Sequence, residues 1–411
     1  MSKIEELIER LCPNGVEYKT IGEVATYRRG SFPQPYTNSS FYGGDGAMPF
    51  VQVADIEDNG FKLKEKTKQT ISKIAQPKSI YVPKGTVICS IQGTIGRVAI
   101  TQFDSYIDRT IAIFESFKME INKRFFAYCI ELKFGIEKQF ARGSTLKTIT
   151  KEEFTKFRIP VPPLEVQCEI VHILDDFTLL SAELSAELEA RKRQYCYYRE
   201  KLFEFNNDGE LKTMGELFPF IRNGFVGTIR PFFTDEKNGI RYLEGTNIHN
   251  GIISDNEMIY VTKEFHQRHK KNELKEDDIL MVQSGHIGEC AVVGKKYKGA
   301  NCHALIIMSN GGKCLSKYIV HYFHTLKGFK ALNPAITGGT IKHVLAGKIG
   351  KIKVPCPPIE EQTKIVNILD KLEKLCNDIS EGLPAEIEAR KKQYEYYRDR
   401  LLTFKELKVN E

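Results

Sequence analysis

The chain has 411 residues, enough at roughly 100 to 200 residues per domain for two to four domains. Its net charge is +7, from 60 Lys and Arg against 53 Asp and Glu, and 41% of its residues are hydrophobic, values that exclude a disordered or fibrous chain. No apolar run reaches the roughly 18 residues of a membrane helix, and the N-terminus alternates charged and apolar residues, so we expect a cytoplasmic protein with no membrane contact.

Residues 1–161 are predicted to form an α/β domain. Short segments rich in β-branched and aromatic residues are separated by Gly, Pro and Asp, a pattern typical of strands joined by turns. They include Ser79–Val82, Thr86–Ile91 and Thr110–Phe114, and a helix is expected at Lys123–Phe134.

Residues 162–206 are predicted to form one long helix. Pro162 and Pro163 mark its start, and no further Pro or Gly occurs before Gly209. Apolar and aromatic residues recur in alternating steps of four and three, the heptad spacing of a coiled-coil seam. A helix over residues 164–205 would be roughly 60 Å long at about 1.5 Å per residue.

This pattern then repeats. The 14 residues Pro162–Asp175 recur 195 residues later as Pro357–Asp370 with nine identities, and Glu189–Arg199 recurs as Glu388–Arg398 at an offset of 199. Residues 207–356 are therefore predicted to be a second, similar α/β domain with a helix at Ser316–Lys327. Residues 357–405 form a second long helix, followed by a tail at 406–411.

The change of offset places four extra residues inside the second helix. The insertion acts as a stutter, which keeps both parts of the seam on one side of the helix while unwinding the supercoil locally. Because Gly382 and Pro384 lie at this point, we expect a kink or a short break there.

Two matching seams in one chain favour an antiparallel pair of helices that pack on each other. The alternative is that each seam packs only on its own domain. The residues expected to pair are Ile170, Leu174, Phe177, Leu184, Leu188, Tyr195, Tyr198, Leu202, Ile365, Leu369, Leu372, Ile379, Leu383, Tyr394, Tyr397 and Leu401.

Only the two domains carry a net positive charge. Residues 1–161 carry a net charge of +6 and residues 206–356 of +7, whereas residues 162–205 carry −4 and residues 357–404 carry −2. Basic domains attract a polyanion such as DNA through counterion release. The alternative is that these charges only form solvated surfaces.

Three stretches in each domain carry the residue types that contact DNA. Arg, Asn and Gln suit base edges, while Gly, Ser and Lys suit phosphates, although the glycines fit tight turns equally well. The candidates in the first domain are Arg28, Arg29, Gln92, Thr94, Arg97, Arg142, Ser144 and Lys147. Those in the second are Arg222, Asn223, Gln283, Ser284, His286, Thr340, Lys342 and His343.

Catalytic and metal-binding motifs are missing from the sequence. It holds no phosphate-binding GxxxxGK[ST] loop, no methyltransferase motif at its one Asn-Pro pair and no catalytic triad, which predicts a binding protein instead of an enzyme. The ten cysteines lack any CxxC pair and are expected to be reduced thiols. The nearest approach to a metal set has no zinc spacing, so we predict no metal site: Cys302, His303, Cys314, His321 and His324.

The repeated Pro-Pro-x-Glu-x-Gln and Glu-Ala-Arg-Lys-x-Gln-Tyr-x-Tyr-Tyr-Arg motifs, together with the start Ile4–Lys19, resemble the DNA-specificity subunits of type I restriction-modification systems. The resemblance implies an α+β fold with two target-recognition domains separated by an antiparallel coiled coil. It implies that each domain reads one half of a bipartite, asymmetric site on double-stranded DNA. The implied partners are methyltransferase subunits that use S-adenosylmethionine and restriction/translocase subunits that use ATP and Mg, with no cofactor in this chain.

Two other classes remain open at this stage. A coiled-coil interaction scaffold with paired protein-binding domains would share the repeat and the seam. A self-contained methyltransferase would need a cofactor site that the sequence does not display.

Overall fold

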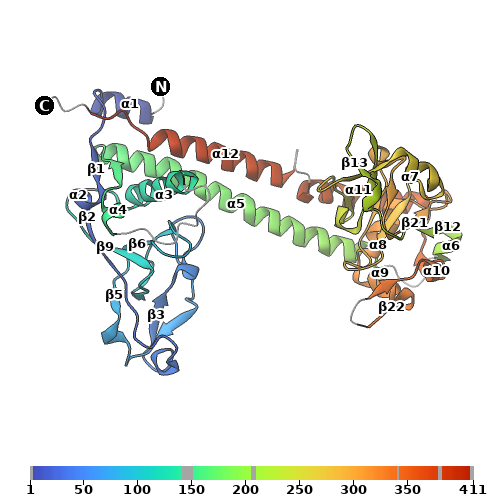
Figure 1. Ribbon diagram of the computed structural model, residues 1–411, viewed down its shortest axis with the longest axis horizontal. Helices are drawn as coiled ribbons and strands as arrows, with labels where there is room; N and C mark the ends of the chain where they lie inside the picture. The colour runs from blue at the N-terminus through green and yellow to red at the C-terminus, as the bar shows by residue number, and fades with distance from the viewer. Residues whose placement is uncertain (1–2, 141–150, 205–209, 340–341, 378–381, 408–411) are drawn as a thin grey trace. The chain divides into compact units, whose positions relative to one another are not determined.

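The computed structural model describes residues 3–140, 151–204, 210–339, 342–377 and 382–407 (Figure 1). They form two compact units, residues 1–185 with 386–411 and residues 186–385, called here the first unit and the second unit. Helix α5 (Leu164–Leu202) gives its beginning to the first unit and its end to the second. Each unit therefore combines one α/β domain with segments of both repeated helices.

The described residues of the first unit include two four-stranded sheets. One is antiparallel throughout, in the order β2-β9-β6-β7. The other, in the order β4-β3-β8-β5, contains one parallel pair, β3 with β8. The strands are Ala25–Arg29 (β2), Met48–Val51 (β3), Gln69–Ile71 (β4), Ile80–Val82 (β5), Val87–Ser90 (β6), Val98–Ile100 (β7), Ser105–Ile107 (β8) and Ile111–Phe117 (β9).

The second unit repeats this arrangement. Its antiparallel sheet has the order β12-β21-β18-β19, and its other sheet, β13-β17-β14-β20, again contains one parallel pair, β14 with β20. The repeat thus extends into regions where the two sequences have diverged. The strands are Phe220–Asn223 (β12), Phe233–Thr234 (β13), Gly239–Leu243 (β14), Ile259–Thr262 (β17), Ile279–Val282 (β18), Cys290–Val292 (β19), Asn301–Cys302 (β20) and Leu305–Ser309 (β21), with small pairs at Ile248–His249 (β15), Ile252–Ile253 (β16), Ile336–Thr337 (β22) and His343–Val344 (β23).

A two-stranded sheet and a one-turn helix connect each domain to its long helix. The sheets pair β1 (Tyr18–Thr20) with β10 (Arg158–Pro160) and β11 (Leu211–Thr213) with β24 (Lys353–Pro355). The helices α2 (Ile21–Val24) and α6 (Met214–Leu217) each begin with a capping box, formed by Thr20 and Glu23 or by Thr213 and Glu216. These caps explain why Lys-Thr-x-Gly-Glu occurs in both halves of the sequence.

The two long helices differ in continuity. α5 is unbroken and ends at Leu202. The second is divided into α11 (Ile359–Asn377) and α12 (Leu383–Leu401), which confirms the break predicted at Gly382 and Pro384. The remaining helices are α1 (Lys3–Leu11), α3 (Lys123–Phe140), α4 (Lys151–Thr155), α7 (Lys263–Arg268), α8 (Ser316–Phe323), α9 (Leu326–Ala331) and α10 (Ala346–Ile349).

The helix predicted at Ser316–Lys327 is wrong in its extent. Two helices occupy this stretch, because Thr325 accepts a hydrogen bond from Gly328 N–H and so caps the start of α9. A Cβ on Gly328 would come within 1.9 Å of Tyr322 O, so only glycine fits where α9 turns away from α8.

The seam residues pack both on the partner helix and on the domain, so the two alternatives considered for them are not exclusive. In the first unit the Phe177 ring stacks on Tyr397 with centroids 5.4 Å apart. The core of that unit collects Ile170, Leu174, Tyr394, Tyr397 and Leu401, and that of the second unit collects Leu188, Tyr195, Leu202, Ile365, Leu369 and Leu372.

Some expected seam positions behave differently. Tyr198 is 40% exposed and its ring contacts Tyr197, whereas its counterpart Tyr397 lies against the first core. Leu184 and Leu383 are half-buried, and Ile379 lies outside the described residues. Phe203, which the heptad pattern does not include, is only 1% exposed and lies against Tyr318.

The N-terminal and C-terminal segments meet in the first unit. Leu407 N–H donates to Val16 O at 2.9 Å, and Tyr18 Oη donates to Phe404 O at 3.1 Å. All ten cysteines are free thiols, and Cys168 and Cys196 are the exposed ones. Among the described residues, no helix is long and apolar enough to cross a membrane.

Candidate nucleic-acid interface

A buried glutamine fixes each domain to its long helix. Gln167 Oε1 accepts from Asn122 N–H at 2.8 Å, and its Nε2 donates to Pro162 O at 2.7 Å. Gln362 makes the same two bonds, from Leu315 N–H at 2.9 Å and to Pro357 O at 2.8 Å. Each glutamine is 1% exposed, so the Pro-Pro-x-Glu-x-Gln motif is the anchor of the domain on its helix.

A carboxylate eight residues further along the same helix, about two turns on, makes the second attachment. In the first unit Asp175 accepts from Arg124 at 2.6 Å and from Tyr128 at 2.7 Å, both on α3. In the second unit Asp370 bonds His321 Nε2 on α8 at 2.9 Å. The two attachments therefore use matching positions with different chemistry.

The long helix of the other repeat contributes a tyrosine to each attachment. Tyr195 Oη lies 3.4 Å from His321 Nδ1 and 3.5 Å from Glu373 Oε1. Its counterpart Tyr394 is half-buried against the core of the first unit, where burial raises the pKa of its hydroxyl. Each domain is thus held by both repeated helices.

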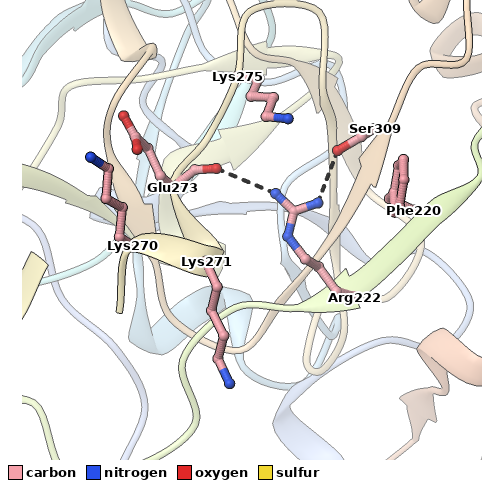
Figure 2. A pocket seen from close by; sticks show the side chains of 7 residues that line it. All are labelled: Phe220, Arg222, Lys270, Lys271, Glu273, Lys275 and Ser309. Atoms are coloured by element: carbon pink, nitrogen blue, oxygen red, sulfur yellow. Dashed lines mark hydrogen bonds between the residues drawn. The ribbon is translucent and has the colours of Figure 1, made fainter. Parts of the chain in front are cut away.

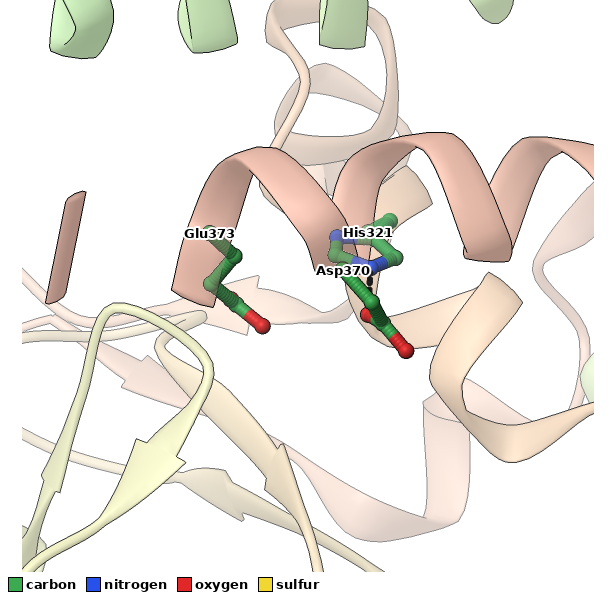
Figure 3. Close-up of side chains that lie close together, drawn as sticks. All are labelled: His321, Asp370 and Glu373. Atoms are coloured by element: carbon green, nitrogen blue, oxygen red, sulfur yellow. Dashed lines mark hydrogen bonds and ion pairs between the residues drawn. The ribbon is translucent and has the colours of Figure 1, made fainter. Parts of the chain in front are cut away.

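The group His321, Asp370 and Glu373 has the residue types of a metal site (Figure 3). Lys317 already supplies positive charge there, because its Nζ lies 2.6 Å from Glu373 and 3.8 Å from Asp370. Burial, the largest cause, lowers the pKa of His321, which favours a neutral imidazole that donates from Nε2. We assign the group to the attachment of the domain, since the matching residues in the first unit offer only one carboxylate.

The sequence set that was rejected as a metal site is not brought together. Cys302 lies in a different hydrophobic cluster from Cys314. Cys314 Sγ instead donates to Gln362 Oε1 at 3.1 Å.

The loops that follow β6 and β18 match each other. Each carries two glycines at the same positions. Gly93 and Gly285 have φ of +77° and +80° and face open space, so each forms the turn at the loop tip. A Cβ on Gly96 would lie 2.6 Å from Phe134 Cβ, and one on Gly288 would lie 3.0 Å from Leu332, so the second glycine of each pair is required by packing. We call these the glycine loops, residues 91–97 and 283–289.

The glycine loops present different side chains on the same backbone. Thr94 follows the tip glycine in the first unit and His286 follows it in the second, and both are exposed. Directly before the tip, half-buried Gln92 matches exposed Ser284, and one position earlier buried Ile91 matches half-buried Gln283. One framework therefore offers two chemistries, as a pair of reading elements requires.

A turn that sequence reasoning missed lies beside each glycine loop. In the first unit, Asp58 of this turn pairs with Arg97 at 2.5 Å. In the second unit, Asn250 N–H donates to Glu289 Oε2 at 2.9 Å. Arg97 and Glu289 are matching residues of opposite charge, so the contact is kept while its chemistry changes. We call these turns the flanking turns, residues 56–60 and 248–251.

The signal for the flanking turns was present in the sequence. Asp55-Ile56-Glu57-Asp58-Asn59-Gly60 corresponds to Asn247-Ile248-His249-Asn250-Gly251 with one residue deleted. Asp55 and Asn247 are 1% and 2% exposed and accept from the N–H of Gln52 and Glu244, which fixes the start of each turn.

A third segment joins the interface in the second unit. His343 Nδ1 lies 2.6 Å from Ser284 Oγ, and Val344 N–H donates to Gln283 O at 2.9 Å. Lys342 beside it is exposed. Thr340, and the corresponding candidates Arg142, Ser144 and Lys147 of the first unit, lie outside the described residues.

The candidate arginines among the described residues are engaged with protein groups. Arg28 pairs with Glu115 at 2.6 Å, and Arg29 is exposed on the same strand, β2. Arg97, besides its pairing with Asp58, donates to Ile56 O at 3.1 Å.

Arg222 lies in a basic pocket apart from the glycine loop, while its neighbour Asn223 is exposed (Figure 2). It donates to Ser309 Oγ at 2.9 Å and to Glu273 O at 3.3 Å. Lysines at positions 270, 271 and 275 line this pocket together with Phe220 and Glu273. Because Ser309 pairs with Phe220 at one end of the sheet and Gln283 follows the other end, Arg222 and Gln283 do not share one contact surface.

Comparison with known proteins identifies the family. Residues 13–190 and 206–389 each match the type I restriction modification DNA specificity domain. The chain therefore belongs to the family of type I DNA specificity proteins, and the α+β fold with two similar domains and a long helix pair is the fold of that family. The interaction scaffold considered from the sequence is not favoured by these matches.

Individual relatives are also type I specificity subunits. The specificity subunit of the type I restriction enzyme EcoR124I/EcoR124II of Escherichia coli is 34% identical over 304 residues, 69% of this chain and 72% of that protein. The EcoprrI specificity subunit of the same species is 28% identical over 413 residues, 93% and 92% of the two chains.

Solved structures share the fold. A chain from a study of complex assembly and conformational transition of the type I R-M system has a TM-score of 0.65 at 15% identity, over 95% of this chain and 98% of that one. The S subunit of a type I restriction-modification system from M. genitalium has a TM-score of 0.53 at 14% identity, over 94% and 96%.

Proposed function

We propose that this chain reads DNA for a type I restriction-modification complex, with each unit reading one half of a bipartite, asymmetric sequence. The supporting observation is the pair of glycine loops. They share backbone geometry and matched packing glycines, yet carry Thr94 in one unit and His286 in the other. Two readers built on one framework with different tips suit two different half-sites.

The helices then set the distance between the half-sites. Recognition segments about one duplex turn apart, roughly 34 Å, contact successive stretches of major groove. The net charges of +6 and +7 on the domains favour the phosphate backbone, and the acidic helices suit protein partners.

The chemistry belongs to other subunits in this proposal. Methyltransferase subunits would supply S-adenosylmethionine and the transfer step, and restriction/translocase subunits would supply ATP and Mg-dependent movement and cleavage. The chain itself is a non-catalytic recognition subunit that acts in the cytoplasm. The EcoR124I/EcoR124II relative is named as a subunit of such an enzyme, which supports this division of work.

Methylome sequencing of cells that make the chain with its methyltransferase tests the proposal. We expect adenine methylation within two short specified sequences separated by an unspecified gap. A continuous methylated site, or a bipartite site that survives loss of the glycine loop of one unit, would contradict it.

Binding of the full chain to random duplex DNA separates this function from a protein scaffold. A DNA reader should bind random duplex weakly, with an affinity that falls steeply as salt rises. No salt-dependent binding would favour the scaffold.

A further inference from the structure

Histidine is distributed very unequally between the two domains. Eight of the nine histidines lie in residues 207–356, none lies in residues 1–161, and the ninth is His172 on α5. Imidazole is the side chain that takes up a proton between about pH 5 and 8 and can also donate or accept hydrogen bonds. An imidazole surface would therefore give one unit a property that the other lacks.

Three exposed histidines from separate segments meet at the glycine loop of the second unit. His249 stands on the flanking turn, His286 at the loop tip and His343 on β23. The His249 and His286 rings have centroids 6.2 Å apart. His343 Nδ1 lies 2.6 Å from Ser284 Oγ of the loop, and the two residues form a β-bridge. We call His249, His286 and His343 the histidine face.

The flanking turn that carries His249 is fixed by a hydrogen bond to Glu289 of the glycine loop. Glu289 accepts from Asn250 N–H at 2.9 Å and lies 3.5 Å from His324 at the end of α8. Burial opposes the imidazolium of His324, whereas Cys290 and Glu289 raise its pKa to about 9. A Cβ on Gly251 would come within 2.9 Å of Glu373 on α11.

Charged groups of both signs lie near the histidine face. Glu289 is the acidic group of this region: it accepts from Asn250 N–H of the flanking turn, and His324 Nε2 lies 3.5 Å from its carboxylate. Exposed Lys342 adjoins His343. At the matching place in the first unit stand Asp58 and Arg97, an ion pair with no imidazole.

We propose that His249 is a specificity-determining residue and that the histidine face reads the second half-site with uptake of protons. This inference rests on the proposed DNA-reading function. Neutral imidazole can pair with base edges, and protonated imidazole adds positive charge facing the phosphates. Affinity for the second half-site should then rise as the pH falls, while the first half-site is read independently of pH.

Binding of the full chain to duplexes selected from a random library tests this, with the first or the second half-site scrambled in turn. His249→Ala should weaken binding to the intact duplex about 5- to 150-fold, the range of one lost base contact, and leave the preference for the first half-site unchanged. Retention of the first half-site preference shows that the first unit is folded, and unchanged hydrogen exchange across residues 210–339 shows that the second unit is folded.

A pH series between 8 and 6 provides the second readout. Affinity for the intact duplex should rise by up to about tenfold per pH unit for each proton taken up. This dependence should be smaller when the second half-site is scrambled, because only contacts to phosphates then remain. His249→Gln, which keeps hydrogen-bonding groups but cannot be protonated, should reduce the slope. His172→Asn, which changes a histidine of the first unit, should leave the slope unchanged.

The outcomes separate the two proposals. Absence of any sequence-selective binding would overturn the DNA-reading function itself. Selective binding of both half-sites with unchanged specificity and pH slope in His249→Ala would overturn only the role of the histidine face.

Discussion

Replacing Gln362 by Met should detach the second domain from its helix. The amide is 1% exposed and satisfies two backbone groups, Leu315 N–H at 2.9 Å and Pro357 O at 2.8 Å. Methionine is similar in length but bonds neither. A buried backbone group left without a partner costs about 1 to 3 kcal/mol, and the apolar side chain recovers part of this, so we expect a loss of about 2 to 4 kcal/mol.

Hydrogen exchange measures this loss locally, which matters because a chain with two units need not unfold in one step. A loss of about 2 to 4 kcal/mol should speed exchange at Leu315 by roughly 30- to 1,000-fold, at about 1.4 kcal/mol per factor of ten. Amides of the first unit should not change. Gln167→Met is the matched control and should speed exchange at Asn122 alone. Unchanged exchange at Leu315 in folded Gln362→Met would show that the glutamine does not anchor the domain.

Three further changes test other parts of the structure. Because burial lowers the pKa of His321, the unfolded chain takes up this proton first as the pH falls below about 6.5. The change in stability of the second unit between pH 7.5 and 5.5 should therefore be less favourable in the wild-type chain than in His321→Gln. Equal shifts in the urea midpoint would contradict this. Gly93→Ala should lower the free energy of unfolding by about 1 to 2 kcal/mol from its positive φ alone. Gly96→Ala, with its Cβ 2.6 Å from Phe134, should lower it by about 2 kcal/mol more, as measured by urea unfolding. Similar losses in the two variants would show that the loop repacks freely. Deleting Glu381–Pro384 should shorten the second helix by roughly 5 to 6 Å, comparable to two base pairs, and change the preferred gap in selected sites while keeping both half-sites; an unchanged gap would show that the insertion does not act on spacing.

The helices were predictable because their signals are local. Heptad spacing, Pro162 at the start and Gly382 with Pro384 at the break depend only on neighbouring residues, and the observed bounds differ from the expected ones by a few positions. The repeat also predicted that the two domains share a fold, which the two sheet orders confirm.

The site was harder to predict from the sequence, since it depends on contacts between segments that are distant along the chain. The flanking turn of the second unit meets its glycine loop across about 40 residues, through Asn250 and Glu289. A one-residue deletion obscured the match between the two turns. Arg222 was selected for its chemistry, but strand pairing directs it to Ser309 and away from the loop, which no local pattern could indicate.

The way the first unit is closed affects the order in which the protein can fold during synthesis. The second unit is one continuous stretch, residues 186–385, whereas the first needs residues 386–407 to complete the core around Leu401 and the bond from Leu407 to Val16. The ribosome therefore releases everything the second unit requires before the first can finish, although the first begins the chain. At about 5 to 20 residues per second the delay lasts a few seconds, during which Ile170 and Leu174 lack their partners on α12. A premature stop after residue 385 would leave the second unit complete and the first permanently open.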